Sequence, residues 1–416
     1  MRRIQNERQI AVSVLMEINQ DKAYNNIALR RALDAAEGLK PHQRAFITEI
    51  VNGCLRNLIL IDYIINNFSR KPASGQKPFI RELLRVSVYQ IRWMDKVPPS
   101  AAVNEAVKMA REYGFEDLTG FINGLLRNVV RQHESIKPSD MGLKYSFPPW
   151  LAEALINWMG ADEAENFCKA SHIPPPVTIC VNPLKTSADE LACKFENAVK
   201  SDVSDMCLHI KRSSDLKTTR AYKEGHFFVI DENAYTAAKA TGAKQGDKII
   251  DLCAAPGGKS FVMAGMMKNK GEIISCDIHP HKIKLMRDTA ARLGISCIKT
   301  EVTDARKRNQ SLTRSADAVL LDAPCTGFGV IRKRPDIKYT KTPADVRKLA
   351  ELQRRLLAAA ASYVKHGGVL VYATCTVSRE ENTDNVEWFL NNYPFTLDWQ
   401  KLTDGFFTAR LIANKI

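Results

Sequence analysis

From Gly242 to its C-terminus, the chain alternates short apolar runs with longer amphipathic stretches. Apolar runs of four or five residues are typical of buried strands, and apolar residues that recur every three or four positions indicate helices. This alternation favours a parallel sheet, because each parallel strand needs a crossover connection that is usually a helix. We therefore predict a doubly wound α/β domain, with a mostly parallel sheet and helices on both faces. The predicted strands are 248–252, 272–276, 296–300, 318–321 and 369–372, and the predicted helices are 261–267, 281–293, 343–363 and 380–391.

The first 135 residues follow a helical pattern throughout. Ala11, Val14, Leu15 and Ile18 keep the i, i+3, i+4, i+7 spacing of one apolar helix face. Similar stretches recur up to residue 135 and predict an all-α bundle of six or seven helices.

A stretch with several prolines, at 136–150, follows this bundle and predicts a linker. After a helix at 151–159, strands at 177–182 and 227–230 around a helix at 188–199 predict a small α/β module. We therefore expect three domains. They are an all-α domain at 1–140, the linker and small module at 141–235, and the doubly wound domain at 236–416.

The 416 residues are 45% hydrophobic and 25% charged, which is typical of a soluble globular protein. No apolar run reaches the roughly 18 residues of a membrane span, and the N-terminus lacks the apolar core of a secretory signal. We expect a cytoplasmic protein without a membrane partner. The formal net charge is +14 and its basic excess is spread along the chain, which favours a nucleic-acid partner. A solvated basic surface would carry the same charge.

Ten cysteines are scattered along the chain, and none forms a C-x-x-C pair, so we expect no metal site. Two of them follow predicted strands directly: Cys325 in Asp-Ala-Pro-Cys-Thr-Gly and Cys375 in Tyr-Ala-Thr-Cys-Thr. In one parallel sheet both thiols would lie at the carboxyl edge, where open α/β sheets bind ligands. Two thiols at such an edge suggest covalent catalysis, in which one attacks and the other helps the product leave.

The loop after the first predicted strand is rich in small residues, which let backbone N–H groups approach a ligand at the head of the next helix. Asp277 follows the second strand at the spacing of an acid that binds a ribose, and Asp304 follows the third strand and could contact an adenine amino group. This order fits S-adenosylmethionine better than NAD. The loop consists of Cys253, Ala254, Ala255, Pro256, Gly257, Gly258 and Lys259.

Methylation of cytosine would need both thiols. Carbon-5 of cytosine is a poor nucleophile until a thiolate adds to carbon-6, and an acid at ring N3 assists that addition. Asp322 would supply this acid if its pKa were raised. Ser378 and Glu381 form an S-x-x-E capping box, and a helix beginning there would favour the Cys375 thiolate. The cations at 332–334 would hold phosphates, and Arg334 or Asp336 would orient a flipped base.

Four segments together resemble the RNA 5-methylcytosine methyltransferases of the Sun/Fmu/NOL1/NOP2 type. They are DLCAAPGGK (251–259), DAPCTGFG (322–329), RKRPDIKY (332–339) and ATCTVSREEN (373–382). The resemblance implies a Rossmann-like class I methyltransferase domain. It also implies that Cys375 is the nucleophile and that Cys325 assists product release. The loop with Asp277, Asp304 and Asp322 would bind S-adenosylmethionine, and Asp322 would also contact the target base.

The helical first domain resembles the antitermination factor NusB, and the small module would be RNA-recognition-like. For a family member with this extension, the resemblance implies a monomer that acts on naked or partly assembled 16S rRNA, at cytosine 967 in the usual rRNA numbering. Three positions depart from the family pattern. Cys180 stands where the family has arginine, Ile230–Ala234 replace a Gln-Asp-x-(Ser/Ala)-Ser segment, and Tyr339 replaces tryptophan.

Three alternatives stay open. A 5-methylcytosine enzyme for tRNA or another rRNA site would have the same chemistry. A DNA cytosine methyltransferase would use its Pro-Cys thiol as the nucleophile, and the second thiol here argues against that class and against a DNA partner. A non-catalytic RNA-binding assembly factor would not need both cysteines, the cofactor loop and all three aspartates.

Overall fold

The computed structural model describes residues 6–210 and 216–415. By its internal packing the chain divides into two compact units. The helical unit comprises Met1–Pro174 together with Ile331–Lys341, and the sheet unit comprises Pro175–Val330 together with Thr342–Ile416. Among the described helices, none combines the length and apolarity needed to cross a membrane.

The helical unit packs its helices around α5, which is buried on most of its surface. The predicted apolar face of the first helix is confirmed, because Ala11, Val14, Leu15 and Ile18 are all buried there. The first seven helices of the described chain fall within the first 135 residues, as predicted. The α-helices of this unit are α1 Glu7–Gln20, α2 Asn25–Ala35, α3 Pro41–Arg56, α4 Leu58–Phe68, α5 Pro78–Trp93, α6 Pro99–Glu112, α7 Thr119–Gln132, α8 Met141–Lys144, α9 Pro149–Met159, α10 Ala161–Ala170 and α16 Ile337–Thr340.

The inserted segment Ile331–Lys341 is anchored in the helical unit by buried polar side chains. Lys338 Nζ donates hydrogen bonds to the carbonyl oxygens of Arg56 (2.8 Å) and Tyr145 (3.2 Å). Asp336 is 1% exposed and lies 3.5 Å from the backbone nitrogen of Asn25. A carboxylate buried in this way is not available to a nucleobase, so our interpretation of Asp336 as a base-orienting residue is wrong.

The sheet unit begins with a four-stranded antiparallel sheet of order β2-β3-β1-β4. The helix predicted at 188–199 is too long: α11 ends at Ala192, and Asn197 has a positive φ of 67°, which an α-helix cannot contain. The strands β2 and β3 were not predicted, and β2 begins within the range assigned to that helix. The elements of this module are β1 Val177–Val181, α11 Ala188–Ala192, β2 Ala198–Lys200, β3 Cys207–Ile210, α12 Arg220–Lys223 and β4 Phe227–Val229.

The main sheet has seven strands in the order β10-β11-β9-β8-β5-β6-β7. All five predicted strands exist, and they pair in parallel. The two additional strands form an antiparallel hairpin beside β9. The first of them, β10, escaped prediction because most of it faces solvent and offers no apolar run, whereas β11 is mostly buried. The strands are β5 Lys248–Leu252, β6 Glu272–Asp277, β7 Ile298–Val302, β8 Ala316–Asp322, β9 Val364–Thr374, β10 Phe395–Thr403 and β11 Phe406–Ala413.

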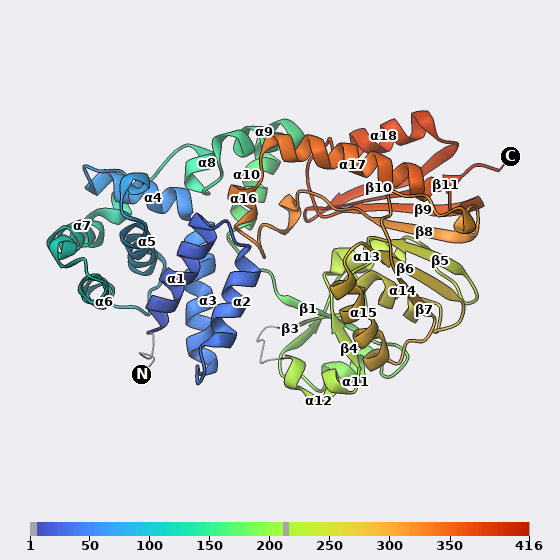
Figure 1. Cartoon of the computed structure of the whole chain (residues 1–416), viewed down its shortest axis with the longest axis horizontal. Coiled ribbons are helices and arrows are strands. Elements are labelled where there is room, and N and C mark those ends of the chain that lie inside the picture. The colour runs from blue at the N-terminus through green and yellow to red at the C-terminus, as the bar shows by residue number, and fades with distance from the viewer. Residues whose placement is uncertain (1–5, 211–215, 416) are drawn as a thin grey trace. The chain divides into compact units, whose positions relative to one another are not determined.

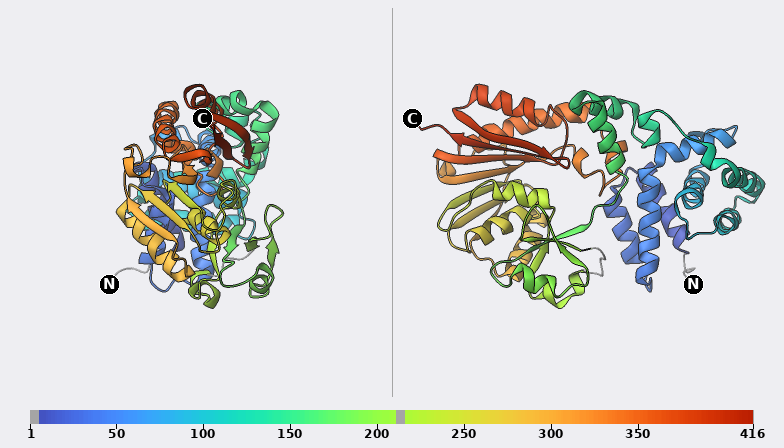
Figure 2. Two further views of the ribbon diagram at one scale, coloured as in Figure 1. Left: turned by 90° about the vertical axis from the view of Figure 1, so that its right-hand side faces the viewer. Right: turned by 180° about the vertical axis from the view of Figure 1, so that it is seen from behind.

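Helices cover both faces of this sheet, as predicted (Figures 1 and 2). Ile249 of β5 packs with Met263 on one face, whereas its neighbour Ile250 packs with Leu357 on the other. The chain builds β6 and β7 on one side of β5, and β8 and β9 on the other. Ligands of doubly wound sheets bind at such a reversal, here between the carboxyl ends of β5 and β8. The helices are α13 Glu232–Lys239, α14 Gly258–Met266 and α15 Pro280–Leu293 on one face, and α17 Pro343–Ala361 and α18 Thr383–Asn392 on the other.

Candidate active site

The loop between β5 and α14 takes a conformation that depends on Gly257. This residue caps α14 with a left-handed φ of 103°. A Cβ atom there would lie 2.6 Å from Phe261 Cζ and 2.8 Å from Met286 Cγ, so only glycine fits. Beneath the loop, the buried Asp251 accepts a short hydrogen bond from the Ser260 hydroxyl, and burial raises the pKa of Asp251 to about 7. The head of α14 is thus fixed to the end of β5.

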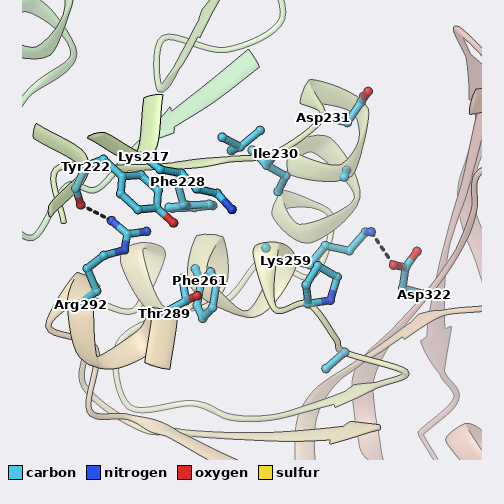
Figure 3. Close-up of a pocket in the computed structure, with 15 residues that line it drawn as sticks. Lys217, Tyr222, Phe228, Ile230, Asp231, Lys259, Phe261, Thr289, Arg292 and Asp322 are labelled. Carbon is cyan, nitrogen blue, oxygen red and sulfur yellow. Dashed lines mark hydrogen bonds and ion pairs between the residues drawn. The ribbon is translucent and has the colours of Figure 1, made fainter. Parts of the chain in front are cut away.

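This loop separates two pockets of the sheet unit. Cys253 and Ala255 line the first, which has a volume of about 510 Å³ and which we call the thiol pocket. Ala254, Pro256, Gly258 and Lys259 line the second, of about 460 Å³, which we call the module pocket (Figure 3). Asp322 lines both pockets, so the two cavities meet at this carboxylate.

The thiol pocket brings together most of the residues that the sequence singled out. Its lining includes Cys253, Ala255, Asp277, Asp304, Asp322, Cys325 and Cys375. Leu352 and Leu356 of α17 add an apolar wall. The predicted loop residue Gly257 lines neither pocket, and its role in the structure is conformational.

The acid that ends β6 and the acid that follows β7 are oriented by local hydrogen bonds. Asp277 accepts from the backbone N–H of Ala255 (3.3 Å) and of His279 (2.9 Å), which ties it to the cofactor loop. Asp304 pairs with Arg306, whose Nη2 lies 2.7 Å from Oδ2. The hydrogen bonds from the Arg306 side chain lower the pKa of Asp304 to about 2. Asp304 is therefore ionised at neutral pH.

Lys259 and Asp322 form an ion pair, with 2.6 Å between Nζ and Oδ2 (Figure 3). Burial lowers the pKa of Lys259, but the negative charges of Asp322 and Asp251 outweigh burial, so the net shift is upward. Lys259 thus remains a cation beside the carboxylate. The sequence predicted only that Lys259 belongs to the cofactor loop. Its pairing with Asp322, which lies 63 positions away in the chain, was not predicted.

The two thiols lie at the carboxyl ends of the parallel neighbours β8 and β9. Their sulfur atoms are 3.2 Å apart, and the backbone N–H of Cys375 points at Cys325 Sγ at 3.3 Å. The hydrogen bond with Cys375 and burial raise the pKa of Cys325 well above the usual value for a thiol. Cys325 therefore keeps its proton while it faces Cys375.

The predicted capping box at Ser378 and Glu381 forms only in part: the Ser378 hydroxyl accepts from the Glu381 backbone N–H (3.3 Å), but α18 begins only at Thr383 with Asn382 as its cap. The Glu381 carboxylate instead reaches the other cysteine loop, where it accepts from the Thr326 backbone N–H (2.9 Å) and hydroxyl (2.5 Å). The Thr326 hydroxyl also contacts that of Thr376 at 2.7 Å. These two threonines directly follow the two cysteines, so Glu381 fixes both loops. The sequence missed this contact because it joins residues 55 positions apart.

The family model "16S rRNA methyltransferase RsmB/F" matches residues 239–412. The NusB family model matches residues 5–131, and a ferredoxin-like domain model of RsmF/B-like methyltransferases matches residues 147–216. A probable ribosomal RNA small subunit methyltransferase B from Bacillus subtilis is 37% identical, over 93% of this chain and 88% of the relative. The chain belongs to the RsmB/F methyltransferase family.

A second relative supports this assignment across the RsmB/F family. The probable ribosomal RNA small subunit methyltransferase B of Synechocystis is 33% identical over 94% of this chain and 90% of its own length. Among solved structures, that of PH0851 superposes with a TM-score of 0.81 at 28% identity and covers 99% of both chains. NSun6 from Pyrococcus horikoshii with SFG has a TM-score of 0.58 at 25% identity, over 65% of this chain and 99% of that one.

Proposed function

We propose that this RsmB/F-family protein transfers a methyl group from S-adenosylmethionine to carbon-5 of a cytosine in 16S rRNA. The observation that carries this proposal is the pair of thiols 3.2 Å apart, in one pocket with Asp277, Asp304 and Asp322. A methyl transfer that needed no covalent adduct would leave this pair of thiols without a role.

The residues of the thiol pocket fit S-adenosylmethionine. Asp277 would accept hydrogen bonds from the ribose hydroxyls, and Asp304 would accept from the adenine amino group. The cofactor loop reaches this pocket through Cys253 and Ala255 and would hold the amino-acid moiety there. When bound, this cofactor supplies the methyl group on a sulfonium centre. The solved structure of NSun6 with SFG, an S-adenosylmethionine analogue, supports the choice of this cofactor.

In the proposed reaction Cys375 attacks the cytosine ring and Cys325 assists release of the methylated product. The Cys375 thiolate adds to carbon-6 of cytosine, and the Lys259–Asp322 pair holds the ring at N3 and the exocyclic amine. The added electron density would make carbon-5 nucleophilic enough to accept the methyl group that the bound cofactor would supply. Once Cys375 is bonded to carbon, its sulfur no longer raises the pKa of Cys325. Cys325 can then release its proton to solvent and accept the carbon-5 proton, after which the carbon–sulfur bond breaks and frees Cys375.

We propose 16S rRNA, and cytosine 967 in particular, as the substrate. The names of the relatives from Bacillus subtilis and Synechocystis, which refer to the small ribosomal subunit, support this choice of RNA. The net charge of +14 suits a polyanionic substrate. A tRNA or another rRNA site remains the alternative within the same chemistry.

The test is the identity and position of the methylated nucleoside. The full chain is incubated with S-adenosylmethionine and protein-free 16S rRNA, and separately with total tRNA, and the digested RNA is examined by mass spectrometry. We expect 5-methylcytidine in the 16S rRNA alone, mapped to one position by bisulfite sequencing. A methyl group on another atom of cytosine would contradict the chemistry, and 5-methylcytidine in tRNA alone would contradict the substrate.

A further inference from the structure

The module pocket lies between the four-stranded module and the main sheet domain, inside the sheet unit (Figure 3). The module contributes Lys217, Tyr222, Phe228 and Val229 to its lining, and helices α14 and α15 contribute the opposite wall. Its volume of about 460 Å³ lies within the range of small-ligand sites. None of the steps proposed for methyl transfer uses the module side of this pocket.

The walls of the module pocket are held together by side chains that cross between the two parts. Arg292 of α15 donates from Nη1 to the carbonyl oxygens of Tyr222 (2.5 Å) and Phe227 (3.2 Å). Its guanidinium lies 3.8 Å from the centre of the Tyr222 ring. Lys185 joins the carbonyl oxygens of Glu224 and Arg292 from the module side. These contacts make the pocket a preformed cavity.

The module pocket opens onto the reacting residues. One side of the cofactor loop faces the thiol pocket, and its other side forms part of the wall of the module pocket. Lys259 and Asp322 close the inner end of the module pocket. Figure 3 shows Tyr222, Phe228 and Arg292 at one end and the Lys259–Asp322 pair at the other. A chain that enters from the module side therefore reaches the carboxylate shared with the thiol pocket.

The lining combines cationic and apolar groups. Lys217 and Arg292 bring positive charge to the outer end, and Phe228 and Phe261 pack edge to face within the wall, each only 4% exposed. Val229 is 56% exposed although it lies on a strand, so it leaves apolar surface uncovered in the pocket lining. A site for a single-stranded nucleotide needs cations that contact the phosphate, next to apolar surface that contacts the base.

We infer that the module pocket binds the nucleotide of the RNA strand that adjoins the target cytosine. Its base lies against Val229, and its phosphate faces Lys217. Because the pocket ends at Asp322, this nucleotide positions the target base over the thiol pocket. The inference rests on the proposed RNA methyl transfer and assigns a specific subsite to it.

The test compares two exposed valines on the same small sheet. Val229→Glu puts a negative charge into the module pocket, whereas Val199→Glu puts it on β2, at the other edge of the sheet and outside the pocket lining. With in vitro transcribed, protein-free 16S rRNA as the probe, we expect Val229→Glu to raise Kd and KM by about tenfold. Val199→Glu should change them less than about twofold, and both variants should bind S-adenosylmethionine as the parent does.

A second pair of variants covers the case in which Val229→Glu fails to fold. Lys217→Ala should weaken RNA binding and reduce the salt dependence of binding by about one phosphate contact. The control is Lys223→Ala on α12, which is exposed and outside the lining.

The outcomes separate this inference from the proposed function. If the pocket variants bind and methylate RNA like their controls while the parent makes 5-methylcytidine, the subsite is wrong and the function stands. If Val229→Glu loses S-adenosylmethionine affinity, the pocket belongs to the cofactor site and the inference is again overturned. If the parent makes no 5-methylcytidine, the proposed function itself fails. Removing the base next to the target cytosine should weaken the binding of this RNA to the parent protein. Val229→Glu should then cause no further loss of affinity for the abasic RNA, because the contact that the variant disrupts is already absent.

Discussion

The loops that follow β8 and β9 are similar in sequence but are built differently. Each carries a cysteine followed by a threonine, and their sulfur atoms nearly touch. The first loop continues into a segment anchored in the helical unit by the buried cation of Lys338. The second continues within the sheet unit and is anchored by the buried carboxylate of Glu381. Two thiols at equivalent places in a fold can therefore be fixed by different elements.

The largest expected effect separates the two thiols by their chemistry. Cys375→Ser should lower single-turnover methyl transfer by about 10⁴-fold or more, because the hydroxyl replaces the proposed nucleophile. Incorporation of a tritiated methyl group into 16S rRNA measures this. Cys193→Ser, which changes an exposed thiol of the module, should leave the rate unchanged. If Cys375→Ser transferred the methyl group at the parental rate, Cys375 would not be the nucleophile, and the proposed difference between the two thiols would be wrong.

The anchor of the second loop should matter next. The Glu381 carboxylate accepts from Thr326 and from Gln353 Nε2, which lies 2.9 Å from Oε2. In Glu381→Gln an amide NH₂ replaces one of these acceptor oxygens, so a donor would face another donor. We expect kcat to fall about 10–100-fold with little change in KM, because both thiols shift. Steady-state kinetics measures this split. Glu387→Gln, at an exposed position of α18, is the control, and equal kinetics for the two variants would show that Glu381 positions nothing.

A smaller effect is expected at the cofactor side of the pocket. Asp277→Asn removes a charged acceptor while it keeps the shape, so the Kd for S-adenosylmethionine should rise about tenfold. Isothermal titration calorimetry without RNA measures it. The matched control is Asp288→Asn, at an exposed position on α15. An unchanged Kd in Asp277→Asn would mean that the cofactor does not contact this acid.

The smallest effect concerns the anchor of the first loop. Burial lowers the pKa of Lys338 to about 7, from an ordinary value of 10.5. Between these values the unfolded chain binds more protons, so the free energy of unfolding should rise with pH, by about 2 kcal/mol from pH 7 to 9. Urea denaturation measures this rise with pH. The rise should be absent in Lys338→Met and present in the control Lys348→Met, at an exposed position of α17. Burial raises the pKa of Glu381, so that group gives the opposite slope, with stability falling as pH rises above about 4.5.

The sequence predicted what depends on local pattern. The parallel strands were visible as apolar runs, and the glycines of the cofactor loop and the two cysteines were visible because each follows a strand. The pairs Lys259–Asp322 and Glu381–Thr326 were not predictable, since each joins residues more than 50 positions apart and depends on the order of strands in the sheet. The burial of Lys338 was hidden for another reason: a lysine in a charged segment normally faces solvent.

The central claim is that Cys375 forms the bond to the base and Cys325 resolves it. Covalent adducts between protein and labelled 16S rRNA on a denaturing gel test it most directly, with S-adenosylmethionine present. The account predicts that Cys325→Ala accumulates a denaturation-resistant adduct and that Cys375→Ala forms none. An adduct that accumulates in Cys375→Ala and is absent in Cys325→Ala would reverse the two roles and contradict the account.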